Sequence, residues 1–335
     1  MSKPKSFIIF LVVILLIGVG VYFLLLAQKE EPKVYRVGVL WTGGEFFTDL
    51  FDAFKEKMAE LGYIEGQSIV YDVYMAPEPV GNEEIVQKYV DEKVDLIFSF
   101  ATEATVEAKK IAAGTGIPVV FSCAFIEGTH LVESVSSPGD NITGVRYPTT
   151  ESAVGRLEYL YEIAPQAQRV WVPCLKDYPT VAAQFEAMEP VASSLGITLI
   201  PGLFTSPAEV QAYLDERTTS ADIGMDAIIM LAEPFSITPE VTELVFKFAD
   251  EHRLPISSAM VLKEAYGPII GFHPTNTKMG SLAAPLADKV LKGTPAGTIP
   301  VVTADNDLRI NYKLIQKLGL TVSEGLMMMA IEVVR

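Results

Sequence analysis

Short apolar runs alternate with amphipathic segments along most of the chain, starting near residue 34. Residues 36–41 read RVGVLW, which is typical of a buried strand in a parallel sheet. Residues 47–61 place apolar side chains at helical spacing, and Gly62 is suited to end that helix. The same alternation predicts further strands at 67–75, 94–100 and 117–122, with helices at 82–92 and from Thr102 onward. Repeated strand–helix units predict an α/β fold with a mostly parallel sheet.

The pattern then occurs a second time. Residues 169–172 correspond to 36–39, 194–197 to 60–63, 226–233 to 95–102, and 254–256 to 117–119, at offsets of 131 to 137 residues. A repeat of this length indicates two similar Rossmann-like lobes. We expect a multi-strand hinge between them, with crossings at 141–148 and 271–274. The predicted lobes comprise residues 34–146 plus 273–298, and residues 147–272 plus 299–335.

The first 33 residues differ from this pattern. Phe7 to Leu26 is a run of 20 apolar or small residues preceded by Lys3 and Lys5. This length suffices to span a bilayer, and the lysines favour a cytoplasmic N-terminus. We expect one transmembrane signal anchor and a short linker within 1–33, on the cell membrane, with the remaining chain on the extracytoplasmic side. The alternative is a long signal cleaved near Ala27, which would leave a secreted or periplasmic protein.

Charge and cysteine content limit the partners. The whole chain has a formal net charge of −16. Residues 1–33 hold four Lys and Arg and two Asp and Glu, so the remainder has 22 basic and 40 acidic residues, a net of −18. Such a surface repels nucleic acid. We expect Cys123 and Cys174 to be separate buried thiols, and the three histidines show no metal-ligand spacing.

Several segments resemble one known family. They read RVGVL (36–40), ELGYIEGQSI (60–69), VDLIFSFATEA (94–104), IPVVFS (117–122), SSPGDNITGV (136–145) and INYKLIQKLGLTV (310–322). From residue 34 to the C-terminus the chain resembles the type I periplasmic binding fold. Within that fold it is similar to the ABC-transporter substrate-binding family that includes tryptophan- and tyrosine-binding members. The resemblance implies a small-molecule ligand, an ABC permease and a cytoplasmic ATPase as partners.

The chain departs from this family at specific places. The histidine–proline pair usual after the first strand is replaced by residues 42–46, and a threonine–aspartate–asparagine-like turn by residues 232–235. Pro190 and Pro285 are expected to interrupt helices that are normally unbroken. The first two departures fall in the loops expected to bind the ligand.

Ligands of open parallel sheets bind beyond the carboxyl ends of the strands. Three loops in each lobe qualify, at 42–46, 101–103, 122–125, 176–178, 232–235 and 257–260. The candidate ligand-binding residues in these loops are Thr42, Glu45, Phe46, Thr102, Glu103, Phe125, Asp177, Tyr178, Glu233, Phe235, Ser257 and Ser258.

These residue types suit a zwitterion, such as an aromatic or branched amino acid. Thr102 is placed to cap a helix whose first N–H groups could bind a carboxylate. Asp177 or Glu233 could bind an ammonium group, the aromatic residues could pack on an apolar side chain, and the serines offer hydroxyl donors. Each position could instead be a cap, a solvated carboxylate or a core residue.

Two other functions remain open. A sensor subunit could present a bound solute to a membrane signalling protein, which an anchor would permit. An α/β enzyme is less favoured, because the chain has no G-x-S-x-G, H-E-x-x-H, Walker or Rossmann motif. We expect a monomer without catalytic residues, metal or cofactor.

Overall fold

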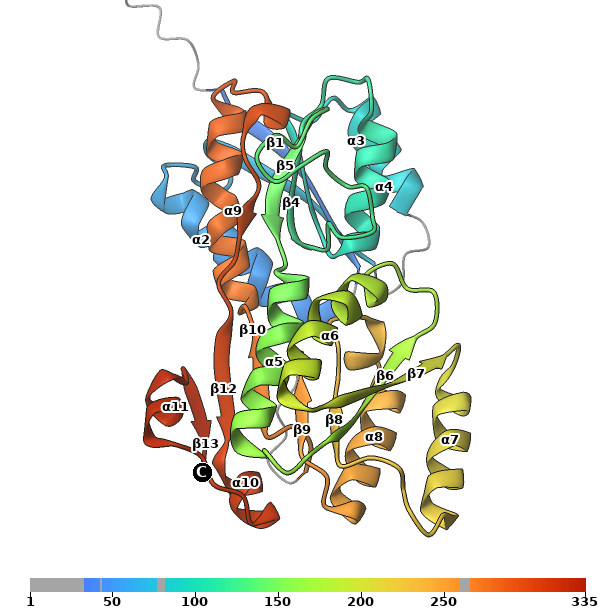
Figure 1. Ribbon diagram of the computed structural model, residues 1–335. Helices are drawn as coiled ribbons and strands as arrows, with labels where there is room; N and C mark the ends of the chain where they lie inside the picture. The colour runs from blue at the N-terminus through green and yellow to red at the C-terminus, as the bar shows by residue number, and fades with distance from the viewer. Residues whose placement is uncertain (1–32, 43, 77–81, 260–265) are drawn as a thin grey trace, which may run out of the picture.

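The computed structural model describes residues 33–42, 44–76, 82–259 and 266–335. Within these residues the chain forms two α/β lobes, which lie one above the other in Figure 1. The apolar run at 7–26 and the alternative cleavage point near Ala27 lie outside the described residues. None of the helices in the described ranges has the length and apolar composition needed to cross a membrane.

The first sheet has the strand order β11-β5-β4-β3-β1-β2, with every pairing parallel. Its strands are β1 (Tyr35–Thr42), β2 (Ile69–Ala76), β3 (Leu96–Phe100), β4 (Val119–Ala124), β5 (Ile142–Arg146) and β11 (Val302–Thr303).

The second sheet has the order β13-β12-β10-β9-β8-β6-β7, and all pairings are parallel except β10 with β12. Its strands are β6 (Arg169–Leu175), β7 (Thr198–Phe204), β8 (Ala227–Ile229), β9 (Ile256–Ser258), β10 (Ile270–His273), β12 (Asp307–Asn311) and β13 (Glu332–Val334). The predicted α/β fold with mostly parallel sheets is therefore confirmed.

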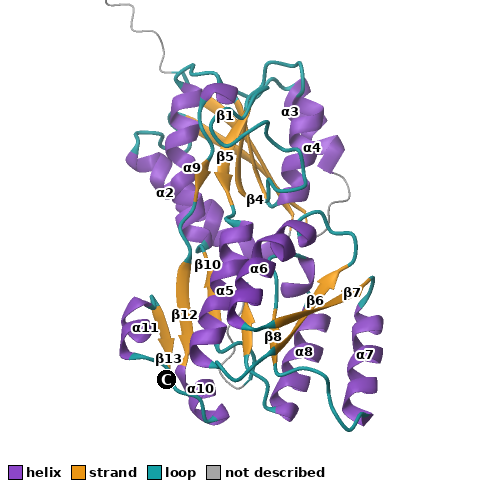
Figure 2. Cartoon of the chain, viewed as in Figure 1, coloured by secondary structure: helices purple, strands orange, loops and turns teal. Residues whose placement is uncertain are grey.

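Helices cover both faces of each sheet (Figure 2). In the first lobe α2 (Thr48–Glu60) packs against α9 (Asn276–Leu291) on one face, and α3 (Asn82–Asp91) against α4 (Thr102–Ala112) on the other. Alternation along β3 accounts for the two cores, because Leu96 and Phe98 join the α2–α9 side whereas Ile97 joins the α3–α4 side.

The second lobe repeats this arrangement. Helices α5 (Thr149–Ile163) and α6 (Val181–Leu195) pack together, as do α7 (Pro207–Thr219) and α8 (Pro239–His252). The remaining helical segments are short, namely η1 (Gly44–Phe47), η2 (Pro234–Ser236), η3 (Ala296–Thr298), α10 (Tyr312–Leu318) and α11 (Glu324–Met329).

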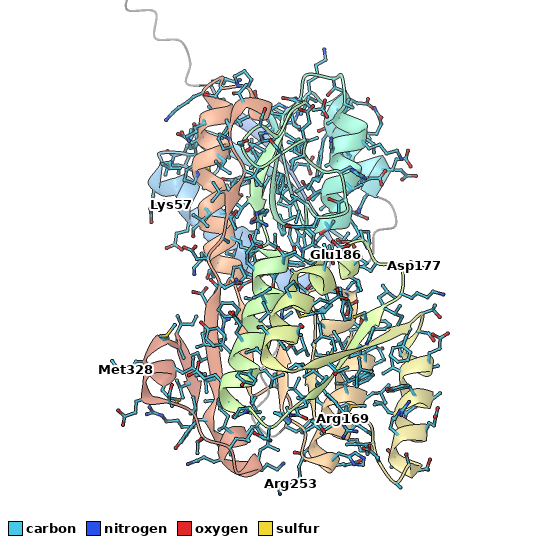
Figure 3. The ribbon with its side chains drawn as sticks, viewed as in Figure 1. Lys57, Arg169, Asp177, Glu186, Arg253 and Met328 are labelled. Atoms are coloured by element: carbon cyan, nitrogen blue, oxygen red, sulfur yellow. The ribbon has the colours of Figure 1, made fainter. Side chains whose placement is uncertain are left out.

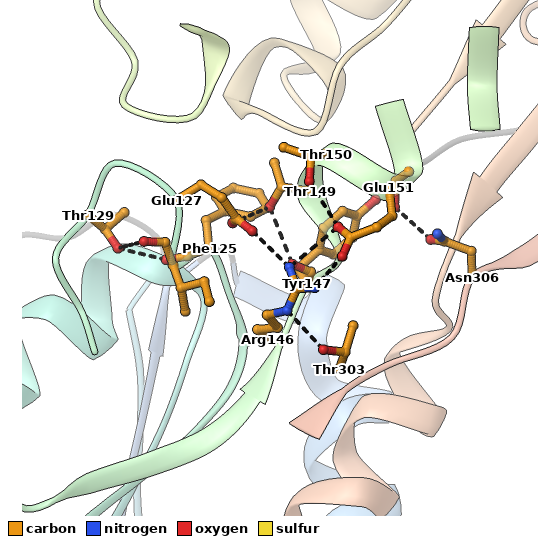
Figure 4. A network of polar contacts seen from close by, with 12 residues as sticks. Phe125, Glu127, Thr129, Arg146, Tyr147, Thr149, Thr150, Glu151, Thr303 and Asn306 are labelled. Atoms are coloured by element: carbon orange, nitrogen blue, oxygen red, sulfur yellow. Dashed lines mark hydrogen bonds and ion pairs between the residues drawn. The ribbon is translucent and has the colours of Figure 1, made fainter. Parts of the chain in front are cut away.

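The described chain passes between the lobes three times. It leaves the first sheet after β5 to begin α5, returns after β10 to begin α9, and leaves again after β11 to begin β12. Arg146, at the end of β5, forms hydrogen bonds to residues at two of these crossings (Figure 4). Its guanidinium donates to Glu127 of the first lobe (2.8 Å), to Thr303 of β11 (2.9 Å) and to Glu151 of α5. These bonds fix the hinge end of α5.

Two predictions about the chain's path are wrong. The boundary that assigned residues from 299 onward to the second lobe is too early, because β11 pairs with β5 in the first sheet. A two-residue strand carries too little pattern to reveal its partner. The helices expected to break at Pro190 and Pro285 continue through them as α6 and α9. A proline removes one N–H donor, and core residues on both sides of it keep each helix packed.

We predict that Gly280→Ala destabilises the first lobe. A Cβ at Gly280 would lie 2.0 Å from the carbonyl oxygen of Leu50, so α2 and α9 would have to separate. Overpacking of this kind costs about 1–3 kcal/mol, measurable as a lower midpoint in urea unfolding. Gly325→Ala is the control, because a Cβ there would meet only the Ser323 hydroxyl at 3.9 Å. Equal midpoints for the two variants would contradict this packing.

Candidate functional site

The carboxyl ends of the strands of the two sheets meet between the lobes. Ala232, three residues after β8, and Ala259, directly after β9, pack in the same apolar cluster as Trp41 and Phe100 of the first lobe. Phe100 ends β3, and Trp41 lies next to the end of β1. Strand ends facing each other in this way form the ligand-binding arrangement of open α/β sheets.

The backbone is strained at three of these strand ends. Ala101 after β3 (φ 55°, ψ 162°), Cys123 in β4 (φ 51°) and Asp177 after β6 (φ 62°) all have positive φ. Such conformations cost about 1–3 kcal/mol each in non-glycine residues and are concentrated at binding sites. In β4 the strain coincides with a shift in register against β5.

Thr102 begins α4 but does not cap it. The N-cap is Ala101, and the Thr102 hydroxyl instead accepts a hydrogen bond from the Phe125 amide at 3.1 Å. The predicted capping role is therefore wrong, because the turn at Ala101 places Thr102 inside the helix, with its side chain against the loop after β4. The first N–H groups of α4 still have no partner within the helix.

Tyr178 crosses from the second lobe to the first. Its hydroxyl donates to a Glu103 carboxylate oxygen at 3.1 Å, and its ring meets Phe125 edge-on at 6.3 Å. Burial and the neighbouring Glu103 carboxylate raise the pKa of Tyr178 well above its usual range. Beside this contact the backbone of Gly128 lies so close to Pro179 that a Cβ would be 2.5 Å from its carbonyl oxygen. The lobes therefore touch along this rim.

Glu233 is the most unusual carboxylate among the described residues. Its side chain is 4% exposed, and one oxygen accepts from the amides of Leu175 (3.1 Å) and Phe235 (3.2 Å). The other oxygen is buried without a partner. Burial raises the pKa of Glu233 from its usual 4.5 to about 7, although the two amide bonds oppose the shift. A buried oxygen without a donor is suited to a cationic ligand group.

The other predicted residues are divided between surface and core. Glu45, Phe46 and Asp177 are exposed, and Figure 3 shows Asp177 on the outer side of the loop after β6. The Phe46 carbonyl accepts from Asn276 of α9 at 2.9 Å. Phe235 lies within the core of the second lobe, so its ring is part of the packing between β6, α7 and α8.

Thr42, Ser257 and Ser258 are buried at strand ends, the first on β1 and the serines on β9. The Ser257 hydroxyl has no partner. Met260 of the predicted 257–260 loop and Gly43 of the 42–46 loop lie outside the described residues.

Several residues at the site were not identified from the sequence. Trp41 stacks on Phe100 (4.8 Å between ring centres), and Phe47 meets Phe100 edge-on (6.2 Å), so an aromatic cluster lies behind the first-lobe strand ends. Arg156 of α5 and Gln184 of α6 are fully buried near Ala232. The sequence does indicate that Arg156 is buried, because it lies among Ala153, Leu157 and Leu160 on an otherwise apolar helix face.

Metal or thiol chemistry has little support in the described residues. No group of three His, Cys, Asp or Glu side chains there could hold a metal ion. Cys123 and Cys174 are buried and unbonded, and burial raises the pKa of Cys123 to about 12. Burial and the Arg309 charge lower the pKa of His273 to about 4, so this imidazole is neutral.

Comparison with known proteins gives a consistent family. The family described as ABC transporter substrate binding protein matches residues 46–334. A tyrosine-binding protein of Clostridioides difficile (strain R20291) is 24% identical over 275 residues, covering 80% of this chain and 75% of its own length.

Solved structures share the fold. The ABC domain in complex with L-Trp from Streptococcus pneumonia has a TM-score of 0.78 at 20% identity, covering 90% of this chain and all of that one. A ligand-free, open substrate-binding protein with adhesive properties from Clostridium difficile has a TM-score of 0.71 at 21% identity, with 90% and 99% coverage. At these identities the structural likeness shows the fold alone.

We predict that Glu233→Gln changes how unliganded stability depends on pH. Because the folded-state pKa lies above the unfolded value, the folded protein holds a proton between pH 4.5 and 7 that the unfolded chain has lost. Below about pH 4.5 this proton adds about 3 kcal/mol to the free energy of unfolding. That contribution is lost as the pH rises to about 7.

Urea unfolding at pH 5 and pH 8 measures the effect. The difference in the free energy of unfolding between the two pH values should be smaller by about 3 kcal/mol in Glu233→Gln than in the parent. The exposed Asp177→Asn is the control and should behave as the parent. An unchanged difference in Glu233→Gln would mean that Glu233 is ionised in the empty protein.

Proposed function

The chain belongs to the ABC transporter substrate-binding protein family, and we propose that it binds a zwitterionic amino acid between its lobes for an ABC importer. The partners would be a membrane permease and its cytoplasmic ATPase. The observation that carries this proposal is Glu233, a buried carboxylate with one unpartnered oxygen beside Ala232, where the lobes meet.

Glu233 suits the ligand ammonium better than Asp177 does. Asp177 is exposed, so water screens its charge, whereas Glu233 is 4% exposed and lacks an ion-pair partner among the described residues. An ammonium group beside its free oxygen would compensate a desolvation cost that the empty protein meets only by taking up a proton. The proposal therefore assigns the ammonium to Glu233.

The first lobe offers groups for the other end of the ligand. The first N–H groups of α4 lie at the positive end of the helix dipole, where a helix can bind one carboxylate oxygen. The buried cluster of Trp41, Phe47 and Phe100 packs with Ala232 and Ala259 where the lobes meet, so an apolar group of the ligand would take the place of this contact between the lobes. An aromatic or branched side chain would complement the cluster. The tyrosine-binding relative and the structural relative in complex with L-Trp support this ligand class.

We further propose that the protein stays on the extracytoplasmic side of the membrane, held by an uncleaved helix at 7–26. The support is the length of that apolar run and the preceding lysines. Mass spectrometry of the protein purified from membranes should give the intact chain. A mature chain that starts near Gln28 would refute the anchor without affecting the ligand proposal.

We predict that the full chain is stabilised by amino acids in a thermal-shift screen that also contains sugars and nucleosides. A ligand at a hundredfold excess over Kd adds about 2.7 kcal/mol to the folded state, which corresponds to roughly 5–10 °C. Tyrosine, tryptophan, phenylalanine, leucine and isoleucine are the primary probes. A shift with a sugar or nucleoside, and none with these amino acids, would refute the ligand class.

Binding of the ammonium should depend on pH and on Glu233. The ionised carboxylate is the binding form, so affinity should fall about tenfold per unit below about pH 7 and level off just above it, where Glu233 is ionised and the ligand ammonium is still charged. Glu233→Gln should bind at least tenfold more weakly at pH 8 and lose this dependence, as measured by calorimetric titration. Asp177→Asn should titrate as the parent. A pH-independent affinity in the parent would remove Glu233 from the ammonium site.

A further inference from the structure

Arg156 is a buried positive charge without a negative partner. It lies on α5, has no exposed surface, and forms no ion pair with any carboxylate in the described residues. Its terminal nitrogens donate to the Phe272 carbonyl (3.2 Å) and to the Gln184 side-chain oxygen (3.4 Å), both neutral acceptors. Its Nε–H has no acceptor. Arginine is almost never buried in this way unless it is paired.

The groups around Arg156 do not supply the missing charge. Burial lowers the pKa of Arg156, but a guanidinium stays protonated in proteins. His273 is nearby and is neutral, because burial and the Arg309 charge lower its pKa to about 4. Asp307 is already paired with Lys278. The cation therefore remains uncompensated in the empty protein.

Tyr147 is a second unsatisfied donor at the same place. It lies on the crossing between β5 and α5 and is 1% exposed, and its hydroxyl lies against the Arg156 side chain without completing a hydrogen bond of good geometry to any described residue. Burial raises the pKa of Tyr147, and the nearby Arg156 charge opposes that shift. The Tyr147 ring meets Phe125 edge-on at 5.4 Å, and Phe125 in turn meets Tyr178 of the other lobe. The two donors thus lie at the hinge end of the contact between the lobes.

Gln184 links Arg156 to the strand end that carries Glu233. The Gln184 side-chain oxygen accepts from the Ala232 amide at 3.2 Å as well as from Arg156, and its nitrogen donates to the Ala232 carbonyl at 3.2 Å. One amide side chain therefore separates the guanidinium from the residue before Glu233. The second lobe therefore holds a cation and a carboxylate, each without a charged partner among the described residues, that are connected through Gln184 and Ala232.

We infer that Arg156, together with the Tyr147 hydroxyl, binds the carboxylate of the ligand at the hinge end of the site. This inference rests on the proposed function and deepens it, since the N–H groups of α4 offer only partial charges whereas Arg156 offers a full one. Arg156 has no exposed surface in the present arrangement. Its two acceptors, the Phe272 carbonyl and the Gln184 side chain, belong to the same lobe, so the ligand carboxylate would take the place of Gln184 as the acceptor.

The test compares an amino acid with its decarboxylated amine on the full chain in detergent. L-Tyrosine with tyramine and L-tryptophan with tryptamine are the pairs, because each shares a side chain and an ammonium group and differs in the carboxylate. Calorimetric titration of the parent should give at least a hundredfold preference for the amino acid. Arg156→Met should weaken the amino acid at least thirtyfold and leave the amine within threefold.

Further variants separate binding from structure. Tyr147→Phe should weaken only the amino acid, by about three- to tenfold. Arg156→Lys should keep part of the preference, because it keeps the charge. Arg253→Met, an exposed arginine at the far end of the second lobe (Figure 3), is the matched control and should bind as the parent. The melting temperature of unliganded Arg156→Met should equal or exceed that of the parent, since an unpaired buried charge is removed.

Each outcome decides the inference. An equal loss of amino acid and amine in Arg156→Met, or unchanged amino acid affinity, would overturn the carboxylate role while leaving the proposed function intact. If Arg156→Met fails to fold, Tyr147→Phe and Arg156→Lys carry the same comparison, and unchanged preferences in both would overturn it. A parent that binds none of the five amino acids of the thermal-shift screen but binds a sugar or nucleoside would overturn the proposed function as well.

Discussion

A charge that is removed from water must be neutralised or matched, and this constraint is unmet at two places in the second lobe. Glu233 keeps one oxygen without a donor, and Arg156 has only neutral acceptors. In both cases burial is the largest cause of the pKa shift and disfavours the charged form. The Glu233 carboxylate can become neutral by binding a proton, as its raised pKa indicates. The Arg156 guanidinium cannot become neutral, because it keeps its proton in proteins. A ligand with both charges would satisfy the two groups at once.

The position of these charges depends on how the lobes are joined. Three crossings of two to three residues each connect the sheets, and Arg146 bonds to two of them and to Glu127 of the first lobe. Short connections of this kind restrict relative motion to bending at the hinge, so the same strand ends always face each other on closure. The contact of Tyr178 with Glu103 and Phe125 then forms at the opposite rim.

The family assignment and the local chemistry carry different information. Similar chains share the fold at about one fifth identical residues, which leaves the binding loops free to differ. Residues 42–46 and 232–235, where this chain departs from the family pattern, include the start of the first-lobe aromatic region and Glu233. The proposed ligand site therefore includes the part of the chain that the family resemblance describes least well.

The sequence by itself determined the alternation of strands and helices and the duplication into two lobes, and it predicted the sheet edge at which we propose the site. These features follow from periodicity, which is local and repeats over many residues. Only the tertiary structure decided that β11 belongs to the first sheet, that Thr102 bonds Phe125 instead of capping α4, and that Phe235 is a core residue. It also decided that Glu233 and Arg156 are buried without charged partners. Burial and pairing depend on residues distant in the chain, such as Leu175 for Glu233 and Phe272 for Arg156, and no local pattern specifies them.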